Sequence, residues 1–98
     1  MAIVAVFEVP GMTRAQYEQS ADKVTGGRGA VTNSADWPVP GLISHTSAPT
    51  PNGWLVVDVW ESDEAFQRFG EFIIPVLREL GAPDVQPKIY PVHTVVTR

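Results

Sequence analysis

The sequence contains no cysteine, and this absence excludes several kinds of chemistry at once. Without a thiol the chain has no disulfide, no thiolate nucleophile, no zinc ribbon and no iron–sulfur cluster. Basic residues are also few, because seven Lys and Arg stand against eleven Asp and Glu, for a net charge of -4. The arginines are isolated along the chain, so there is no basic stripe for a phosphate backbone, and nucleic acid is not an expected partner.

Long apolar stretches that lack charge and proline are absent as well. The longest uncharged stretch, residues 37–57, contains four prolines, which excludes a membrane span. The apolar N-terminus has no basic residue before Arg14, which does not fit a signal peptide. The sequence therefore predicts a soluble cytoplasmic protein with no membrane partner.

The composition that remains is typical of one small folded unit. The chain has 98 residues, of which 44% are hydrophobic and 18% charged. This length suits one domain and is too short for two. We therefore expect a single domain over residues 1–98, whose function comes from one core or from an assembly of copies.

The first half of the chain predicts a strand, a helix and a long loop. Residues 2–9 are rich in β-branched and aromatic residues and end at two turn formers. Thr13 and Gln16 form a capping box, so a helix should begin there and run to about residue 25, with Tyr17 as a hydrophobic staple. Residues 26–41 have no periodicity. They predict either a surface connection or a lid over a pocket, with Trp37 as its apolar plug.

The middle of the chain predicts a β-hairpin. Two strand-like runs, residues 42–50 and 54–61, flank an Asn-Gly dipeptide, which favours a two-residue type I′ turn. That turn places His45 opposite Trp60, on the same sheet face as Asp58. A three-residue loop places His45 on the other face, with Leu55 and Val57. The dipeptide favours the first register.

The second half of the chain predicts a helix and a last strand. Ser62 is a suitable N-cap, and apolar residues then recur at helical spacing as far as about residue 80. Pro75 should kink this helix or divide it in two. Residues 88–97 predict a strand in which Pro91 belongs at a sheet edge. The order strand, helix, strand, strand, helix, strand is that of the ferredoxin-like α+β fold, an antiparallel sheet with two helices on one face.

Several of these residues form patterns that resemble those of a known protein superfamily. Residues 57–66 have the sequence Val-Asp-Val-Trp-Glu-Ser-Asp-Glu-Ala-Phe, and the patterns Leu-Ile-x-His at 42–45 and Tyr-Pro-x-His at 90–93 flank it. From residue 41 onward the chain resembles the dimeric α/β-barrel superfamily typified by antibiotic biosynthesis monooxygenases, and most closely an actinobacterial branch of it. The resemblance implies a homodimer in which two four-stranded sheets form one barrel, with a small-molecule pocket between each sheet and its own helices. A sheet with two apolar faces and a proline-bearing edge strand needs such a partner on physical grounds too.

The resemblance also suggests an activity. It implies cofactor-independent oxygenation, or proton-transfer cyclisation or isomerisation, of an aromatic or polyketide-like substrate, with no cofactor and no metal. Haem-degrading relatives use a helix Trp and a helix His; Phe69 stands at the Trp position and the helix beyond it has no His, so haem degradation is not expected. Fold alone does not define function, so a non-catalytic ligand-binding or assembly domain with structural histidines stays an alternative.

Candidate site residues follow from the side-chain chemistry. The chain has two imidazoles, His45 and His93, neither within a local metal motif. Asp58 lies in an apolar strand, where a carboxylate is costly unless it is paired. We expect His45 to abstract a proton with Asp58 orienting it, and Tyr90 or His93 to stabilise the enolate. The substrate contacts expected beside them are aromatic: Trp60, Trp37 and Phe69.

Three other roles stay open for these polar residues. His45 and His93 could meet across the dimer, as a base and its orienting group or as metal ligands. Each histidine could also be a hydrogen-bonded structural residue. Asp58 could serve only as a partner in an internal hydrogen bond or ion pair.

Overall fold

The computed structural model describes residues 1–27, 29, 33–82 and 85–97 of the chain. The elements follow in the order strand, helix, strand, strand, helix, strand, with one short 3-10 helix before the second strand. They are β1 (Ile3–Pro10), α1 (Arg14–Val24), η1 (Ser34–Asp36), β2 (Leu42–Thr50), β3 (Gly53–Trp60), α2 (Asp63–Glu79) and β4 (Lys88–Pro91). None of the described helices is long and apolar enough to cross a membrane.

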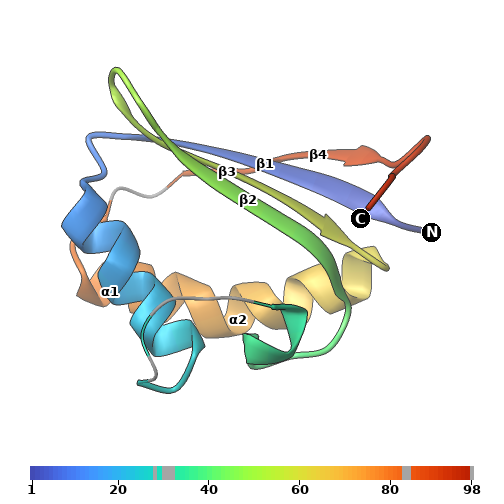
Figure 1. Cartoon of the computed structure of the whole chain (residues 1–98), viewed down its shortest axis with the longest axis horizontal. Coiled ribbons are helices and arrows are strands. Elements are labelled where there is room, and N and C mark those ends of the chain that lie inside the picture. The colour runs from blue at the N-terminus through green and yellow to red at the C-terminus, as the bar shows by residue number, and fades with distance from the viewer. Residues whose placement is uncertain (28, 30–32, 83–84, 98) are drawn as a thin grey trace.

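The four strands form one antiparallel sheet in the order β2-β3-β1-β4. Both helices lie on the same face of this sheet, and the opposite face carries no helix (Figure 1). This arrangement confirms the ferredoxin-like α+β fold expected from the sequence. Pro91 lies in the edge strand β4, as its missing N–H requires. A barrel built from two such sheets needs a second chain and stays a prediction.

The hydrophobic core lies between the sheet and the first half of α2. Ala5 of β1 and Trp60 of β3 are fully buried there, and Phe66 and Phe69 of α2 pack against them. The Trp60 ring centroid lies 5.1 Å from that of Phe69 and 6.2 Å from that of Phe66. Close packing therefore fills this end of the layer between sheet and helices.

Two cap structures determine where the helices begin. At α1, the Thr13 hydroxyl accepts from the Gln16 backbone N–H at 3.1 Å, and the Thr13 N–H donates to Gln16 Oε1 at 3.0 Å, which confirms the predicted capping box. At α2, the Ser62 hydroxyl accepts from the Ala65 backbone N–H at 3.1 Å. Each cap satisfies a backbone donor that the first helical turn leaves unpaired.

The β2–β3 hairpin has the predicted faces but a different turn. Thr50 pairs with Gly53, so the loop is Pro51-Asn52 and His45 pairs with Asp58 rather than with Trp60. The type I′ prediction is wrong, because it needs positive φ at both loop residues and no described residue other than glycine has one. Gly53 is instead taken into the strand, where a Cβ would collide with the carbonyl oxygen of Val9. The register moves by two residues, so His45 keeps its predicted face.

The second half departs from the prediction in two places. α2 is not divided at Pro75 but continues as one helix from Asp63 to Glu79, whereas the kink that was the other alternative stays a prediction. Both Pro75 and Glu71, whose carbonyl loses its helical donor, are exposed, so water can satisfy that carbonyl. β4 ends at Pro91 instead of continuing to residue 97, and the Val92 N–H makes one more bond, 3.0 Å to the Ala2 carbonyl.

We predict that Gly41→Ala destabilises the fold more than Gly27→Ala. Both glycines have positive φ, +112° and +93°, so both substitutions strain the backbone. A Cβ at Gly41 would also lie 2.7 Å from Cβ of Ala65, whereas Gly27 has open space around it. Urea unfolding should show a loss of about 1 kcal/mol for Gly27→Ala and about 2 to 4 kcal/mol for Gly41→Ala. Equal losses would contradict the close contact between residue 41 and α2.

Candidate active site

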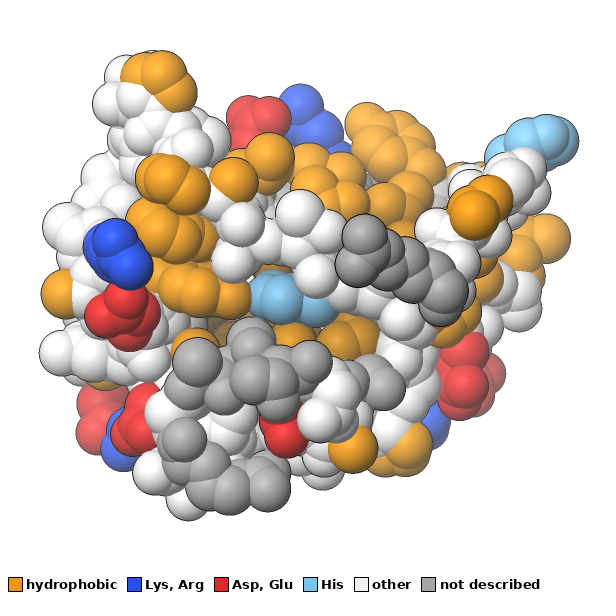
Figure 2. Space-filling model, in the orientation of Figure 1, with side chains coloured by type: hydrophobic (Ala, Val, Ile, Leu, Met, Phe, Trp, Pro, Cys, Tyr) orange, Lys and Arg blue, Asp and Glu red, His pale blue; other side chains and the backbone are white. Residues whose placement is uncertain are grey.

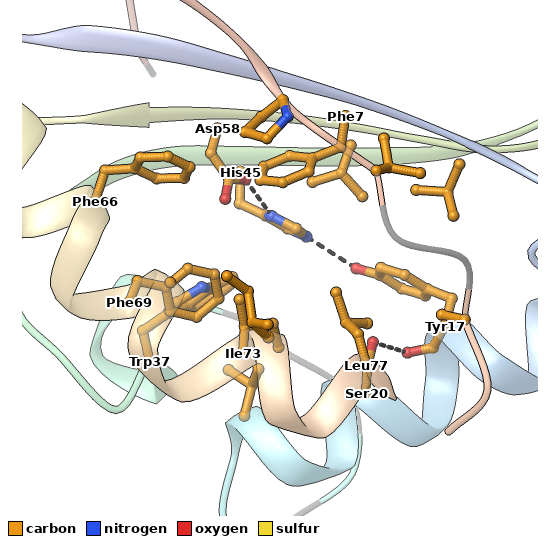
Figure 3. Close-up of a pocket in the computed structure, with 18 of the residues that line it drawn as sticks. Phe7, Tyr17, Ser20, Trp37, His45, Asp58, Phe66, Phe69, Ile73 and Leu77 are labelled. Atoms are coloured by element: carbon orange, nitrogen blue, oxygen red, sulfur yellow. Dashed lines mark hydrogen bonds and ion pairs between the residues drawn. The ribbon is translucent and has the colours of Figure 1, made fainter. Parts of the chain in front are cut away.

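A cavity of about 680 Å³ lies between the sheet and the two helices, next to the packed core. Its walls are mainly apolar and include Phe7 of β1 and Phe69 and Ile73 of α2 (Figure 3). Val56 of β3 also lines it. This volume is within the range of about 300 to 1,000 Å³ typical of small-molecule pockets. The few polar side chains at the cavity are therefore the candidates for chemistry.

Three polar side chains form a continuous chain of hydrogen bonds at this cavity. His45 Nδ1 lies 2.6 Å from Asp58 Oδ1, and His45 Nε2 lies 2.8 Å from the Tyr17 hydroxyl (Figure 3). Three different elements supply them, because Tyr17 comes from α1, His45 from β2 and Asp58 from β3. Direct pairing of His45 with Asp58 across the two strands brings the imidazole and the carboxylate together.

The donor and acceptor roles follow from the chemistry of the groups. Asp58 as a carboxylate only accepts, so Nδ1 of His45 carries the proton and donates to it. When the imidazole is neutral, Nε2 is then an acceptor, and the Tyr17 hydroxyl 2.8 Å away is its donor. Asp58 is 1% exposed. Among the side chains that the structure describes, His45 is the partner that compensates for the lost hydration of this carboxylate.

Tyr17 is held firmly in this arrangement. Its ring stacks on Trp54 of β3, with centroids 5.0 Å apart and 18° between the ring planes. Burial raises the pKa of Tyr17 above its usual value of 10.0; a side-chain hydrogen bond with Ser47 acts in the opposite direction, and the negative charge of Asp58 adds to the rise. The phenol therefore keeps its proton at neutral pH and remains a hydrogen-bond donor.

Trp37 covers His45 from the side of the α1–β2 connection. The two ring centroids are 4.8 Å apart at 60°, and Trp37 lines the cavity. Trp37 and Val39 also pack against the core cluster. The expected lid over 26–41 includes residues 28 and 30–32, which lie outside the described residues, so its lid role stays a prediction.

The structure brings some of the predicted site residues together and separates others. His45, Asp58, Trp37 and Phe69 all line the cavity. Trp60 is fully buried within the core and is not among the described lining residues, because α2 packs directly onto it.

The two C-terminal candidates lie apart from this group. Tyr90 is 53% exposed and pairs with Val4, which places it on the sheet face that carries no helix. His93 is exposed beyond the end of β4. Neither is among the described lining residues of the cavity, so an enolate-stabilising role for them in one chain lacks support. A meeting of His93 with His45 needs a second chain and stays a prediction. The described residues contain no group of three or more metal-ligating side chains.

Tyr17 is the site residue that the sequence analysis missed. The staple assignment accounted for its ring and left its hydroxyl without a role. The sequence did contain a signal for a role of this hydroxyl. A staple residue faces the sheet, and a tyrosine hydroxyl that is buried there needs a polar partner. The polar side chains expected on that sheet face were His45 and Asp58, and the structure pairs the hydroxyl with His45.

Solved structures include proteins with the same fold as this chain. No family model and no curated protein matches the sequence. Two crystal structures of SnoaB, a cofactor-independent oxygenase from Streptomyces nogalater, match with TM-scores of 0.59 and 0.58, the second being a mutant form. They are 16% and 18% identical to this chain, and each match covers 99% of this chain and 96% of the SnoaB chain. At this identity the likeness establishes the fold, and the cavity residues must carry the argument about chemistry.

The raised pKa of Tyr17 predicts a measurable alkaline titration. In Tyr90→Phe, Tyr17 is the single tyrosine that remains of two. The midpoint of its phenolate absorbance should lie at a higher pH in the folded protein than in urea. Since the folded state resists losing this proton, the associated stability persists below the unfolded pKa and is lost as the pH rises through the folded value. A folded titration midpoint at or below the unfolded one would contradict this environment.

Proposed function

We propose that this protein is a cofactor-independent enzyme that acts on an aromatic or polyketide-like small molecule. Its first step is removal of a proton from an acidic hydroxyl or carbon of the substrate, with His45 as the base. The observation that carries this proposal is the fixed imidazole at an apolar cavity, with Nδ1 held 2.6 Å from a carboxylate that is 1% exposed.

The geometry supports His45 as a base for two reasons. Asp58 fixes the tautomer in which Nε2 is the basic nitrogen, and its negative charge stabilises the imidazolium that forms on protonation. The apolar walls of the cavity limit competition from water, which strengthens these electrostatic interactions.

The substrate class follows from the same cavity. Apolar and aromatic walls suit a ring system, and the histidine suits one weakly acidic group on it. The resulting electron-rich anion can react with dioxygen or attack an internal electrophile without a cofactor. The fold likeness to SnoaB supports oxygenation as the later step. The proton transfer is common to both routes.

A chromophoric probe tests the proton transfer without knowledge of the natural substrate. We predict that 4-nitro-1-naphthol, whose anion absorbs visible light, is more ionised when bound than when free at the same pH. In His45→Ala and in Asp58→Asn the bound probe should return to the neutral form, because the base is lost or is no longer oriented. Visible absorbance of the probe at saturating protein measures the ionised fraction.

Two control variants and one contrary outcome separate the explanations. Asp63→Asn is a matched control, because this exposed carboxylate at the start of α2 lies outside the cavity lining, and the ionised fraction should be retained. An equal loss in His93→Ala would assign the base to histidines from two chains. Retained ionisation in His45→Ala would contradict the proposed base and favour a ligand-binding domain with structural histidines.

We also propose that two copies pair through the uncovered sheet faces. The side chains there that alternate with the cavity-facing ones are largely apolar: Val4, Val6, Leu55 and Val57 are partly exposed, and Val59 is buried. Contiguous apolar patches of this kind mark interaction sites. A second copy carries the same surface, so the two copies can meet through the same patch around a two-fold axis.

Val57→Glu should convert a dimer into a monomer, because Val57 lies in the central strand β3 and its side chain points to the uncovered face. Burying a carboxylate between two sheets without a partner would oppose association. Light scattering coupled to gel filtration measures the mass. Arg68→Glu on the exposed side of α2 is the control and should leave the dimer intact. A wild-type monomer at micromolar concentration would contradict this interface.

A further inference from the structure

The acceptor nitrogen of His45 is already occupied. A neutral imidazole has one acceptor nitrogen. Here Nδ1 is engaged by Asp58, and Nε2 receives the Tyr17 hydroxyl at 2.8 Å. A substrate proton therefore cannot reach Nε2 directly while this bond remains. The substrate must either displace Tyr17 or transfer its proton through it.

We propose that Tyr17 is the catalytic residue that contacts the substrate and relays its proton to His45. This inference rests on the proposed function and adds a group to it. In the step, the O–H or C–H bond of the substrate breaks and its proton bonds to the Tyr17 oxygen. The original Tyr17 O–H bond breaks in the same step, and that proton bonds to Nε2 of His45. The products are a substrate anion and an imidazolium paired with Asp58.

The relay leaves Tyr17 neutral and reverses its hydrogen bonds. Nε2–H of the imidazolium now donates to the Tyr17 oxygen, and the Tyr17 hydroxyl donates to the anionic oxygen of the substrate. One hydroxyl thus receives the proton and then stabilises the charge that its removal creates. Because burial raises the pKa of Tyr17, a free tyrosinate does not compete with this state.

The structure favours a relay over displacement because Tyr17 is fixed from several sides. Its ring stacks on Trp54, and its backbone N–H donates to the Thr13 carbonyl at 3.0 Å within the capped first turn. The Ser20 hydroxyl donates to the Tyr17 carbonyl at 2.7 Å. Moving the phenol away from His45 would break the ring stack, whereas a relay needs no movement beyond the protons.

A second hollow gives the same pair access to solvent. This wider opening between α1 and β2 is lined by Arg14, Glu18 and Ser47, and it shares Tyr17 and His45 with the cavity. Figure 2 shows that the surface is hollowed on the face that it depicts. The imidazolium can therefore return its proton to water from this side while the product still fills the cavity.

Tyr17→Phe tests the relay, because it removes the hydroxyl and keeps the ring that stacks on Trp54. With 4-nitro-1-naphthol as the probe, we expect the ionisation constant of the bound naphthol to fall about 10- to 100-fold, the effect of losing one hydrogen bond to a charged group. The affinity for 1-nitronaphthalene, which has no hydroxyl, should not change. If Tyr17→Phe raises the ionised fraction of the bound probe, Tyr17 blocks the base. If the fraction does not change, Tyr17 has only a structural role. Either result overturns the relay.

Fluorotyrosine provides a second test that does not depend on a deletion. In the Tyr90→Phe background, biosynthetic incorporation of 3-fluorotyrosine places the analogue at residue 17 alone. The fluorinated phenol is the stronger donor, so the bound naphtholate fraction should rise relative to the same background with ordinary tyrosine. An unchanged fraction would overturn the donor role even where Tyr17→Phe fails to fold.

His45→Ala distinguishes failure of the relay from failure of the proposed function. Loss of probe ionisation in His45→Ala together with retention in Tyr17→Phe overturns the relay and leaves His45 as the base. Retention in both variants overturns the relay and the proposed function together. Loss in both variants, with unchanged 1-nitronaphthalene binding, supports the relay.

Discussion

The pairing of His45 with Asp58 across two neighbouring strands is the interaction on which the site depends. A carboxylate that is 1% exposed is costly unless a partner compensates for its lost hydration, and the imidazole 2.6 Å away is that partner. The pair requires the β2–β3 register, because a shift by one residue would turn His45 to the opposite face. The register of the β2–β3 pair therefore decides whether the two side chains of the site can meet.

The remainder of the molecule places this pair between a packed region and an open one. On one side Trp60 and Phe66 fill the layer between sheet and helix. On the other side a cavity remains, and Tyr17 and Trp37 reach His45 from two separate segments. The proposed catalytic role depends on this arrangement, in which a packed core lies next to an unfilled space.

The sequence predicted the elements of this structure better than their ends. The capping box at Thr13 was found because its signal is local, and the face of His45 was found because it depends only on the parity of the register. The sequence left open whether α2 continues through Pro75 or breaks there, because the answer depends on whether solvent can satisfy the freed carbonyl. Trp60 was expected at the ligand, and only the packing of α2 shows that it is enclosed.

The sequence by itself determined the order of elements, the ferredoxin-like topology and the presence of a carboxylate that needs a partner. These properties follow from periodicity, turn residues and the cost of burying a charge, all of which act over a few residues. The tertiary structure decided that Tyr17, His45 and Asp58 form one chain of hydrogen bonds. Their separation along the sequence, across a helix and two strands, leaves no local pattern, and a hydrogen bond requires positions accurate to a few tenths of an ångström that only the packed fold supplies.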